Sequence, residues 1–223
     1  MSQSQQPIIV KNTKSYLAIN KPPGWLSQSG RNSDISILEY YQSKNPGKLH
    51  LLNRIDRPVS GMVLLSKTRA FTKSFVEAQN NNLVSKTYLA VVEGKVEVEN
   101  NELEHWLVHD KRQMCSYITD QNNQHAKKCT LSFKRLGLFD RYSLLEITIR
   151  KGKFHQIRAQ LSFYGHPIKG DVKYGARRGN RDRSIHLHSH KLKFENPVSE
   201  TIQFTAPIWT GDSLWEAATG MLV

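Results

Sequence analysis

One aspartate of this 223-residue chain lies in a local sequence that suits catalysis. Asp56 stands between Arg54 and Arg57 in LLNRIDRPVSGMVLLSKT, residues 51–68, where a predicted Ser60–Gly61 turn leads into an apolar strand. Neighbouring cations keep a carboxylate ionised, which suits a nucleophile or a general base. The same residues could instead form an Asx-type turn with solvated arginines, and local chemistry alone supports this structural alternative at least as well.

The elements that must position Asp56 are strands and helices in no regular alternation. Runs rich in Val, Ile, Leu and Tyr predict strands at Tyr16–Asn20, Met62–Ser66, Thr87–Val92, Cys129–Leu136, Tyr142–Ile149, His186–Phe194 and Thr201–Thr205. Helical spacing and end signals predict helices at Ile35–Gln42, Phe71–Asn80 and His155–Tyr164. This mixture predicts an α+β fold rather than a doubly wound parallel sheet.

Positive charge is concentrated in one segment. The chain carries 32 Lys and Arg against 19 Asp and Glu, a net charge of +13. Residues 150–193 hold twelve basic and two acidic side chains, and so contribute +10. A solvated basic face is one explanation, but residues that could stack on bases are interleaved with the cations, namely Phe154, His155, Phe163, Tyr164 and Tyr174. We therefore favour a nucleic-acid partner.

Two stretches predict loops. Ala176–Arg183, ARRGNRDR, is expected to be a mobile basic loop between ordered elements. Residues 97–102 are expected to be a loop within one domain, because strand-like sequence flanks them.

The cysteines indicate a reducing compartment. Cys115 and Cys129 are the two cysteines and form no CxxC pair, so neither a disulfide framework nor a thiol-rich metal site is expected. The polar N-terminus predicts no signal peptide, and no stretch has the roughly 18 apolar residues that a membrane helix needs. A cytoplasmic protein without membrane contact is expected.

The histidines do not follow a metal-binding pattern. His105 and His109 lack the HExxH context of a zinc site. His186, His188 and His190 alternate along a predicted strand, where we favour a surface strand that contacts phosphates over a metal site, because no carboxylate or cysteine accompanies them at ligand spacing. No metal is expected.

Five segments together resemble one enzyme family. NRIDRPVSGMVLLSKT, around Asp56, resembles the HRLDxxTSGLLLxAKT signature of the RluA family of pseudouridine synthases. INKPPGW at 19–25, KTYLAVVEG at 86–94 and GKFHQIRAQLSFYGHPIKGDVKYG at 152–175 resemble, in order and spacing, the family's KPxG, KxYxAxVxG and HQIRxHLxxxGxPIxGDxxYG motifs. LHSHKLKFENP at 187–197 resembles the strand that closes the family's site. The resemblance covers nearly all of residues 15–210.

The resemblance implies a fold and a reaction. The fold would be the pseudouridine synthase catalytic fold, a largely antiparallel mixed sheet with flanking helices and loops around a central basic cleft. A single catalytic domain would cover residues 15–223 after a flexible segment at 1–14, without an accessory N-terminal RNA-binding domain. The reaction would isomerise uridine in RNA to pseudouridine without a cofactor.

The resemblance also implies roles for individual residues. Asp56 matches the catalytic aspartate, Tyr88 the active-site tyrosine near the uracil, and Arg158 the arginine that pairs with the aspartate. Arg54 matches an arginine that enters the RNA stack in place of the flipped uridine. The predicted substrate-binding residues are Asn53, Arg54, Arg57, His155, Gln156, Ile157, Leu187, Arg177 and Arg178.

The chain departs from the family pattern at two places. Asn53 stands where the family usually has histidine, and Ala159–Gln160 stands where it prefers an apolar residue followed by histidine.

The leading hypothesis is an RNA pseudouridine synthase that acts on rRNA or tRNA as a monomer. A non-catalytic RNA-binding protein on the same scaffold is the alternative. Asp56, Tyr88 and Arg158 favour the enzyme, because pure binding does not need a carboxylate that repels phosphate. A hydrolase that pairs Asp56 with a histidine has no partner motif in the sequence.

Overall fold

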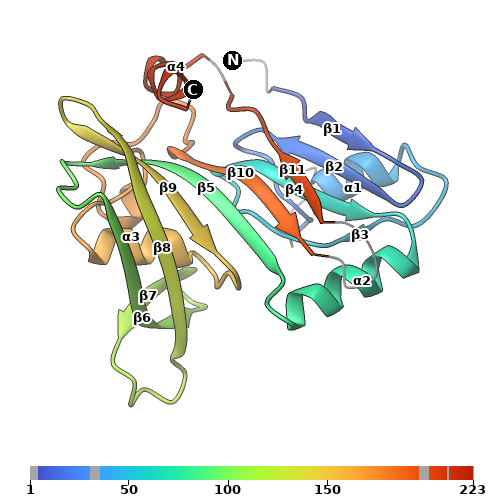
Figure 1. The fold of residues 1–223 in the computed structure, drawn as a ribbon, viewed down its shortest axis with the longest axis horizontal. Coiled ribbons are helices and arrows are strands. Elements are labelled where there is room, and N and C mark those ends of the chain that lie inside the picture. Colours follow the sequence, from blue (N-terminus) through green and yellow to red (C-terminus); the bar gives the residue numbers. More distant parts are fainter. Residues whose placement is uncertain (1–4, 31–35, 196–200, 210, 223) are drawn as a thin grey trace. The chain divides into compact units, whose positions relative to one another are not determined.

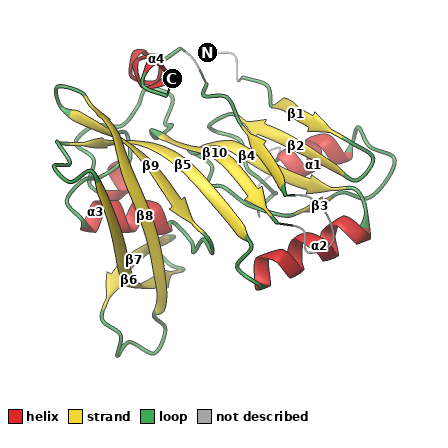
Figure 2. Ribbon diagram, in the orientation of Figure 1, coloured by secondary structure: helices red, strands yellow, loops and turns green. Residues whose placement is uncertain are grey.

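A computed structural model describes residues 5–30, 36–195, 201–209 and 211–222. The chain forms two compact units, which we describe separately. The first comprises Met1–Lys86 and His188–Thr210, and the second comprises Thr87–Leu187 and Gly211–Val223. Strands make up most of the regular structure, with few helices (Figure 2). The mixed, mostly antiparallel α+β fold expected from the sequence is confirmed, whereas the single catalytic domain and the basic cleft stay predictions.

The first unit is built on strands β1 (Ile8–Asn12), β2 (Tyr16–Lys21), β3 (His50–Leu51), β4 (Ser60–Ser66), β10 (Leu187–Phe194) and β11 (Ile202–Thr205) (Figure 1). They are ordered β1-β2-β4-β10, with β3 beside β4 and β11 beside β10. The β4–β10 pair is parallel, and the other pairs within this group are antiparallel. Every residue of β2 and β4 is buried, which fits the apolar residues at the centre of both strands.

Two helices accompany this sheet. In α1 (Ile37–Gln42), Ser36 and Glu39 form a capping box, and α2 (Arg69–Asn80) begins after Thr68, whose side chain accepts from the Phe71 amide. Phe75 and Ala78 of α2 enter a core cluster that also contains residues of β2, β4, β10 and β11. Burial of this apolar face fixes β4, which directly follows the Asp56 loop.

The turn predicted at Ser60–Gly61 is wrong, because both residues lie inside β4. Ser60 is paired with His188 and Gly61 with Ser189 in the parallel ladder. Gly61 has φ +112°, and a Cβ atom there would lie 2.3 Å from the Ser189 carbonyl oxygen. The glycine therefore permits close strand approach, and the turn lies one step earlier, where the Val59 amide donates to the Asp56 carbonyl (3.1 Å).

The second unit carries strand β5 (Val84–Glu93) from Thr87 onward, and strands β6 (Asn100–Asp110), β7 (Cys115–Thr119), β8 (Lys127–Leu138) and β9 (Tyr142–Ile149), in the order β5-β9-β8-β6-β7. The β8–β9, β6–β8 and β6–β7 pairs are antiparallel. Its helices are α3 (Gln156–Phe163), the short 3-10 helix η1 (Val172–Tyr174) and α4 (Ser213–Gly220) (Figure 1). Leu107, Cys129, Ala159 and Tyr174 form a buried cluster here.

The predicted strands and helices are all present, with bounds shifted by a few residues; Ile35, where the first predicted helix starts, lies outside the described residues. Ile8–Asn12 forms a strand where a flexible segment was predicted. The sequence did not predict this edge strand because only Val10 is partly buried, so no apolar face distinguishes it. Strand β6 begins at Asn100 and shortens the loop predicted at 97–102. Within the described ranges, no helix is both long and apolar enough to cross a membrane.

Candidate active site

The Asp56 loop is anchored to its own unit on both sides of the carboxylate. Asn53, which is buried, donates through Nδ2 to the Met62 carbonyl (2.9 Å) and accepts through Oδ1 from the Leu64 amide (2.8 Å), so its amide completes the edge of β4. The Ser27 hydroxyl donates to the Ile55 carbonyl (2.9 Å) and accepts from the Ile55 amide (3.1 Å). Contact between Asn53 and RNA, which the sequence predicted, stays a prediction.

A second set of contacts holds the other side of the loop. The Gly24 amide donates to the Arg57 carbonyl (2.8 Å), and Arg57 Nε donates to the Gly24 carbonyl (3.0 Å). Asp56 is half-buried between these anchors, whereas Arg54 and Arg57 are exposed. The backbone on both sides of Asp56 is thus fixed before any substrate arrives.

Lys21 supports the Asp56 loop, and the sequence predicted no role for it. Its side chain is fully buried, and Nζ donates to the carbonyls of Pro22 (3.0 Å), Trp25 (2.8 Å) and Arg57 (3.2 Å). Burial lowers the pKa of Lys21 to about 7, and the charge of Asp56 opposes that shift. Lys21 therefore joins the 22–25 loop to the residue beside Asp56. The INKPPGW motif was the available signal, but a lysine is rarely buried.

Arg158 lies in the second unit, on α3, and is buried with Asp171. Its Nε donates to Asp171 Oδ2 (2.6 Å) and its Nη2 to Oδ1 (2.8 Å), which makes a bidentate ion pair. The guanidinium carbon lies 4.8 Å from the centre of the Tyr174 ring. The side chains of Asp171 and Tyr174 thus orient the guanidinium, and the sequence predicted no role for Asp171.

Tyr174 ties this arrangement to the start of α3. Its hydroxyl accepts from the Ser116 amide (2.8 Å) and bonds His155 Nδ1 (2.9 Å). Burial raises the pKa of Tyr174 to about 12. His155 has φ +52°, in the left-handed region, and stacks on Phe154 with ring centres 3.9 Å apart. A non-glycine residue held in this region indicates a site where the surroundings determine the backbone.

The remaining predicted residues divide into buried and exposed groups. Tyr88 of β5 is 7% exposed, and Gln156, Ile157 and Leu187 are also buried. Gln156 Nε2 donates to the Thr130 carbonyl and to Gln160 Oε1 (both 3.0 Å). Exposed are Arg54, Arg57, Arg177 and Arg178. Asp56 belongs to the first unit and Tyr88 and Arg158 to the second, so the structure describes their surroundings separately.

The histidines near β10 correct the predicted phosphate-contacting surface strand. His188 is fully buried, and its Nε2 donates to the Ala206 carbonyl (3.1 Å) while Nδ1 accepts from the Ser60 hydroxyl (2.8 Å). Burial lowers its pKa to about 4, so the ring is neutral. His186 is buried as well, with Nε2 3.0 Å from Asp212 Oδ1. The His188 ring thus joins β10 to β4 and to Ala206, and the His186 ring contacts Asp212 at the start of α4.

The described part of the chain contains no arrangement of side chains suited to metal binding, and its buried thiol at Cys129 is not suited to reaction. No group of three or more His, Cys, Asp or Glu side chains there is placed to hold a metal ion. Cys129 is buried, which raises its pKa to about 11, and its Sγ donates to the His105 carbonyl. A thiol in this environment packs rather than reacts.

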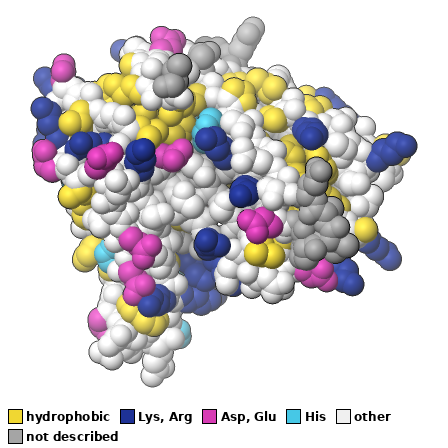
Figure 3. Space-filling model, viewed as in Figure 1, with side chains coloured by type: hydrophobic (Ala, Val, Ile, Leu, Met, Phe, Trp, Pro, Cys, Tyr) yellow, Lys and Arg dark blue, Asp and Glu magenta, His cyan; other side chains and the backbone are white. Residues whose placement is uncertain are grey.

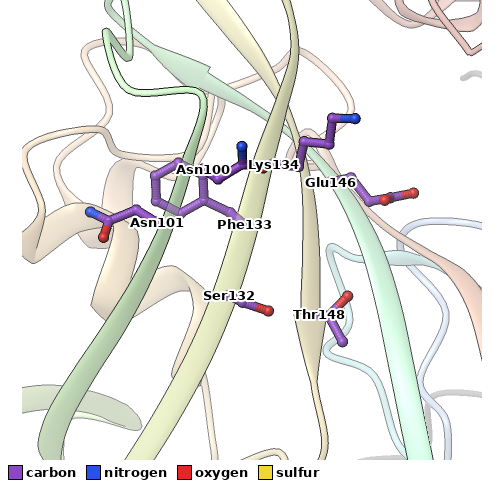
Figure 4. A pocket seen from close by; sticks show the side chains of 7 residues that line it. All are labelled: Asn100, Asn101, Ser132, Phe133, Lys134, Glu146 and Thr148. Atoms are coloured by element: carbon purple, nitrogen blue, oxygen red, sulfur yellow. The ribbon is translucent and has the colours of Figure 1, made fainter.

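Two pockets among the described residues of the second unit differ in character. One, of about 340 Å³, is formed by β6, β8 and β9 and lined by Asn100, Asn101, Ser132, Phe133, Lys134, Glu146 and Thr148 (Figure 4). It contains one cation and one carboxylate and none of the predicted site residues. The other, of about 580 Å³, is lined by four basic side chains, including Arg177 and Arg178. On the face shown in Figure 3, Lys and Arg side chains lie in several separate groups, with acidic side chains beside some of them.

Comparison with known families shows which family the chain belongs to. The sequence profile described as RNA pseudouridylate synthase matches residues 15–163, two thirds of the chain. The chain belongs to this family. The RluA-type resemblance seen in the sequence is thereby confirmed, and members of the RNA pseudouridylate synthase family are isomerases.

Curated relatives in the RNA pseudouridylate synthase family include tRNA pseudouridine synthase C of Pectobacterium carotovorum subsp. carotovorum, 26% identical over 89% of this chain and 58% of the relative. Ribosomal large subunit pseudouridine synthase C of Haemophilus ducreyi is 29% identical over 86% of this chain and 62% of the relative. The relative named uncharacterized RNA pseudouridine synthase YjbO, from Bacillus subtilis (strain 168), is 30% identical over 90% of this chain and 72% of its own length. The chain therefore spans about three fifths of the length of the first two relatives.

Two solved structures share the fold of this RNA pseudouridylate synthase family member. Human RNA Pseudouridylate Synthase Domain Containing 1 superposes with a TM-score of 0.73 at 19% identity, over 100% of this chain and 97% of that one. Human RNA Pseudouridylate Synthase Domain Containing 4 gives a TM-score of 0.75 at 20% identity, over 96% and 92%. At these identities the likeness concerns the fold.

Proposed function

We propose that this protein isomerises uridine in structured RNA, either tRNA or rRNA, to pseudouridine, with Asp56 as the catalytic carboxylate. The observation that carries the proposal is the half-buried Asp56 on a loop fixed from both sides by Lys21, Ser27 and Asn53. Family membership supports the reaction, and the names of the relatives, which mention tRNA and the large ribosomal subunit, support both RNA classes.

The proposed reaction is an isomerisation and needs no co-reactant. The N1–C1′ bond of the target uridine breaks, the uracil turns, and a C5–C1′ bond forms; the proton on C5 leaves and N1 gains one. Asp56 acts on the sugar, either by attack at C1′ or by removal of the C2′ proton. A carboxylate suits both roles when it is ionised and preorganised. The uridine must leave the RNA stack first, and exposed Arg54 is proposed to fill the gap.

Arg158 is proposed to pair with Asp56 during the reaction. A guanidinium has five N–H donors, and the ion pair with Asp171 engages Nε and Nη2. Asp171 would then hold the orientation of Arg158 rather than compete with Asp56. Tyr88 is proposed to lie against the uracil and to relay the proton released from C5.

RNA contact is proposed for Arg57, His155, Arg177 and Arg178 in addition to Arg54. Arg54, Arg57, Arg177 and Arg178 are exposed, as phosphate contacts require. The free thiols of Cys115 and Cys129 support a reducing compartment such as the cytoplasm. We retain the monomer as the working oligomeric state.

The experiment that tests the function maps pseudouridines across total RNA from cells with and without this gene. The proposal expects at least one tRNA or rRNA uridine to lose its modification in the deletion strain and to regain it with the wild-type gene. The Asp56→Asn gene should fail to restore it. An unchanged map, together with RNA binding by the purified protein, would favour the non-catalytic alternative.

A further inference from the structure

A basic pocket on the second unit is built from three separate segments. Its volume is about 580 Å³, and it lies between the end of β5, the β8–β9 turn and the segment 169–179 that surrounds η1. The residues that line it are Glu93, Gly94, Arg141, Tyr142, Lys169, Arg177, Arg178 and Gly179. Four of them are cations and one is a carboxylate, so the lining carries a net charge of +3.

Hydrogen bonds within the second unit hold the three segments in place. The Gly94 amide donates to the Arg141 carbonyl (2.9 Å), and the Lys169 amide donates to the Val91 carbonyl (2.9 Å). The Arg177 amide donates to Glu93 Oε1 (3.0 Å). Each segment is thus joined to β5, and the cations are presented by a preformed frame instead of three independent loops.

The one carboxylate of the pocket does not neutralise the cations. Glu93 Oε1 accepts from the Arg177 backbone amide, and Oε2 lies 4.0 Å from Arg177 Nε, at the limit of an ion pair. The Arg177 side chain is 92% exposed, and Arg141 and Arg178 are exposed too. Lys169, which is half-buried, directs its Nζ to Asn180 Oδ1 and stays within the lining. Like charges that converge on one hollow repel each other unless an anion enters.

We propose that this pocket binds consecutive phosphates of the RNA backbone. This inference rests on the proposed function for the identity of the RNA, and adds Arg141 and Lys169, far apart in the chain, to the predicted contacts at Arg177 and Arg178. Exposed arginines around an open pocket suit a phosphodiester chain that passes across the surface, because each phosphate can be bound from one side. A small phosphate would instead need buried donors on several sides.

The test measures how RNA affinity depends on salt for an unmodified tRNA transcript. The pocket variant is R141Q/R177Q/R178Q, and the matched control is K11Q/K48Q/K73Q, which removes the same charge from exposed positions of the first unit. Log affinity falls as log salt rises, and each lost phosphate contact reduces the magnitude of this slope by about 0.7–0.9. The pocket variant should lose about 2 from the slope, and the control should keep the wild-type slope. Thermal melting confirms that both variants fold.

Two results would overturn the inference. One is a slope that falls equally in the pocket variant and the control. The other is an unchanged RNA slope together with lost binding of uridine 5′-monophosphate, which would indicate a site for small nucleotides. Turnover of the wild-type protein is measured separately. If the wild type binds RNA through the pocket but forms no pseudouridine, the proposed function fails and the pocket inference stands.

Discussion

Arg158 and Asp171 form a bidentate ion pair in which both side chains are almost fully buried, with donor–acceptor distances of 2.6 and 2.8 Å. Thirteen residues separate them in the chain, and the Tyr174 ring lies against the same guanidinium. Removing one partner of a buried pair leaves the other charge without compensation, which costs more than the pair itself contributes. Asp171 therefore orients the Arg158 guanidinium and compensates its buried charge.

The first prediction concerns Asp171→Asn. The variant keeps the shape of the side chain but leaves Arg158 without its carboxylate, and should lose about 3–5 kcal/mol of unfolding free energy. Urea unfolding followed by circular dichroism measures this loss. The control is Glu77→Gln, which breaks the exposed Lys73–Glu77 pair and should change stability by less than about 1 kcal/mol. Equal stability of the two variants would contradict the role of Asp171.

The second prediction concerns Lys21→Met. Methionine preserves the apolar stem but removes the donor to the Pro22 and Trp25 carbonyls and one donor to the Arg57 carbonyl, which also accepts from the Gly24 amide. An unmade buried hydrogen bond costs about 1–3 kcal/mol. Removing the buried ammonium offsets part of that cost, so we expect a net loss of at least about 2 kcal/mol.

Chemical denaturation checks this prediction, with Lys73→Met on the exposed side of α2 as the control that should stay near wild type. A Lys21→Met protein as stable as wild type would show that the three hydrogen bonds do not stabilise the Asp56 loop.

The third prediction is a pH dependence caused by His188. Its pKa in the folded protein is about 4, below its ordinary value of 6.5, so the unfolded chain binds a proton in this range that the native ring does not. The stability linked to His188 is complete above pH 6.5 and is lost as pH falls toward 4, by about 3 kcal/mol in all.

Unfolding free energies measured between pH 7 and 5 check this dependence. His188→Gln should flatten the decline, whereas His125→Gln, at an exposed position, should reproduce the wild-type slope. A His188→Gln protein with the wild-type slope would contradict a buried neutral His188.

The fourth prediction concerns Tyr88→Phe. Phenylalanine keeps the buried ring, and so the fold and RNA affinity should stay nearly normal. The variant lacks the hydroxyl proposed to relay the C5 proton, and most turnover should be lost after glycosidic cleavage. Single-turnover kinetics on the native RNA measures this step. A wild-type rate would make Tyr88 an ordinary core residue.

The sequence predicted the apolar strands well and the polar ones poorly. Strands β4 and β9 are apolar enough to be recognised, whereas β6, NNELEHWLVHD, begins with exposed polar residues and resembles a loop. Helix α4 was missed although Asp212 caps it. Short, surface-facing elements depend on neighbours that a local pattern does not contain.

The candidate site was predicted from motifs, but its supporting contacts were not. Asp56 was recognisable because arginines flank it, whereas Asp171 has no local feature that indicates a partner thirteen residues away. Lys21 would ordinarily be assigned to the surface. The hydrogen bonds of Asn53 with the backbone of β4 were not predicted either, and its contact with RNA stays a prediction. Pairings of this kind are set by tertiary structure.

The most direct test of the central claim is tritium release from RNA that carries 5-tritiated uridine, because formation of the C5–C1′ bond expels the C5 hydrogen. Wild-type protein should release tritium from a tRNA or rRNA substrate. Asp56→Asn, which keeps the size of the side chain, should bind the same RNA and release none above background. Appreciable release by Asp56→Asn would contradict the assignment of Asp56 as the catalytic carboxylate.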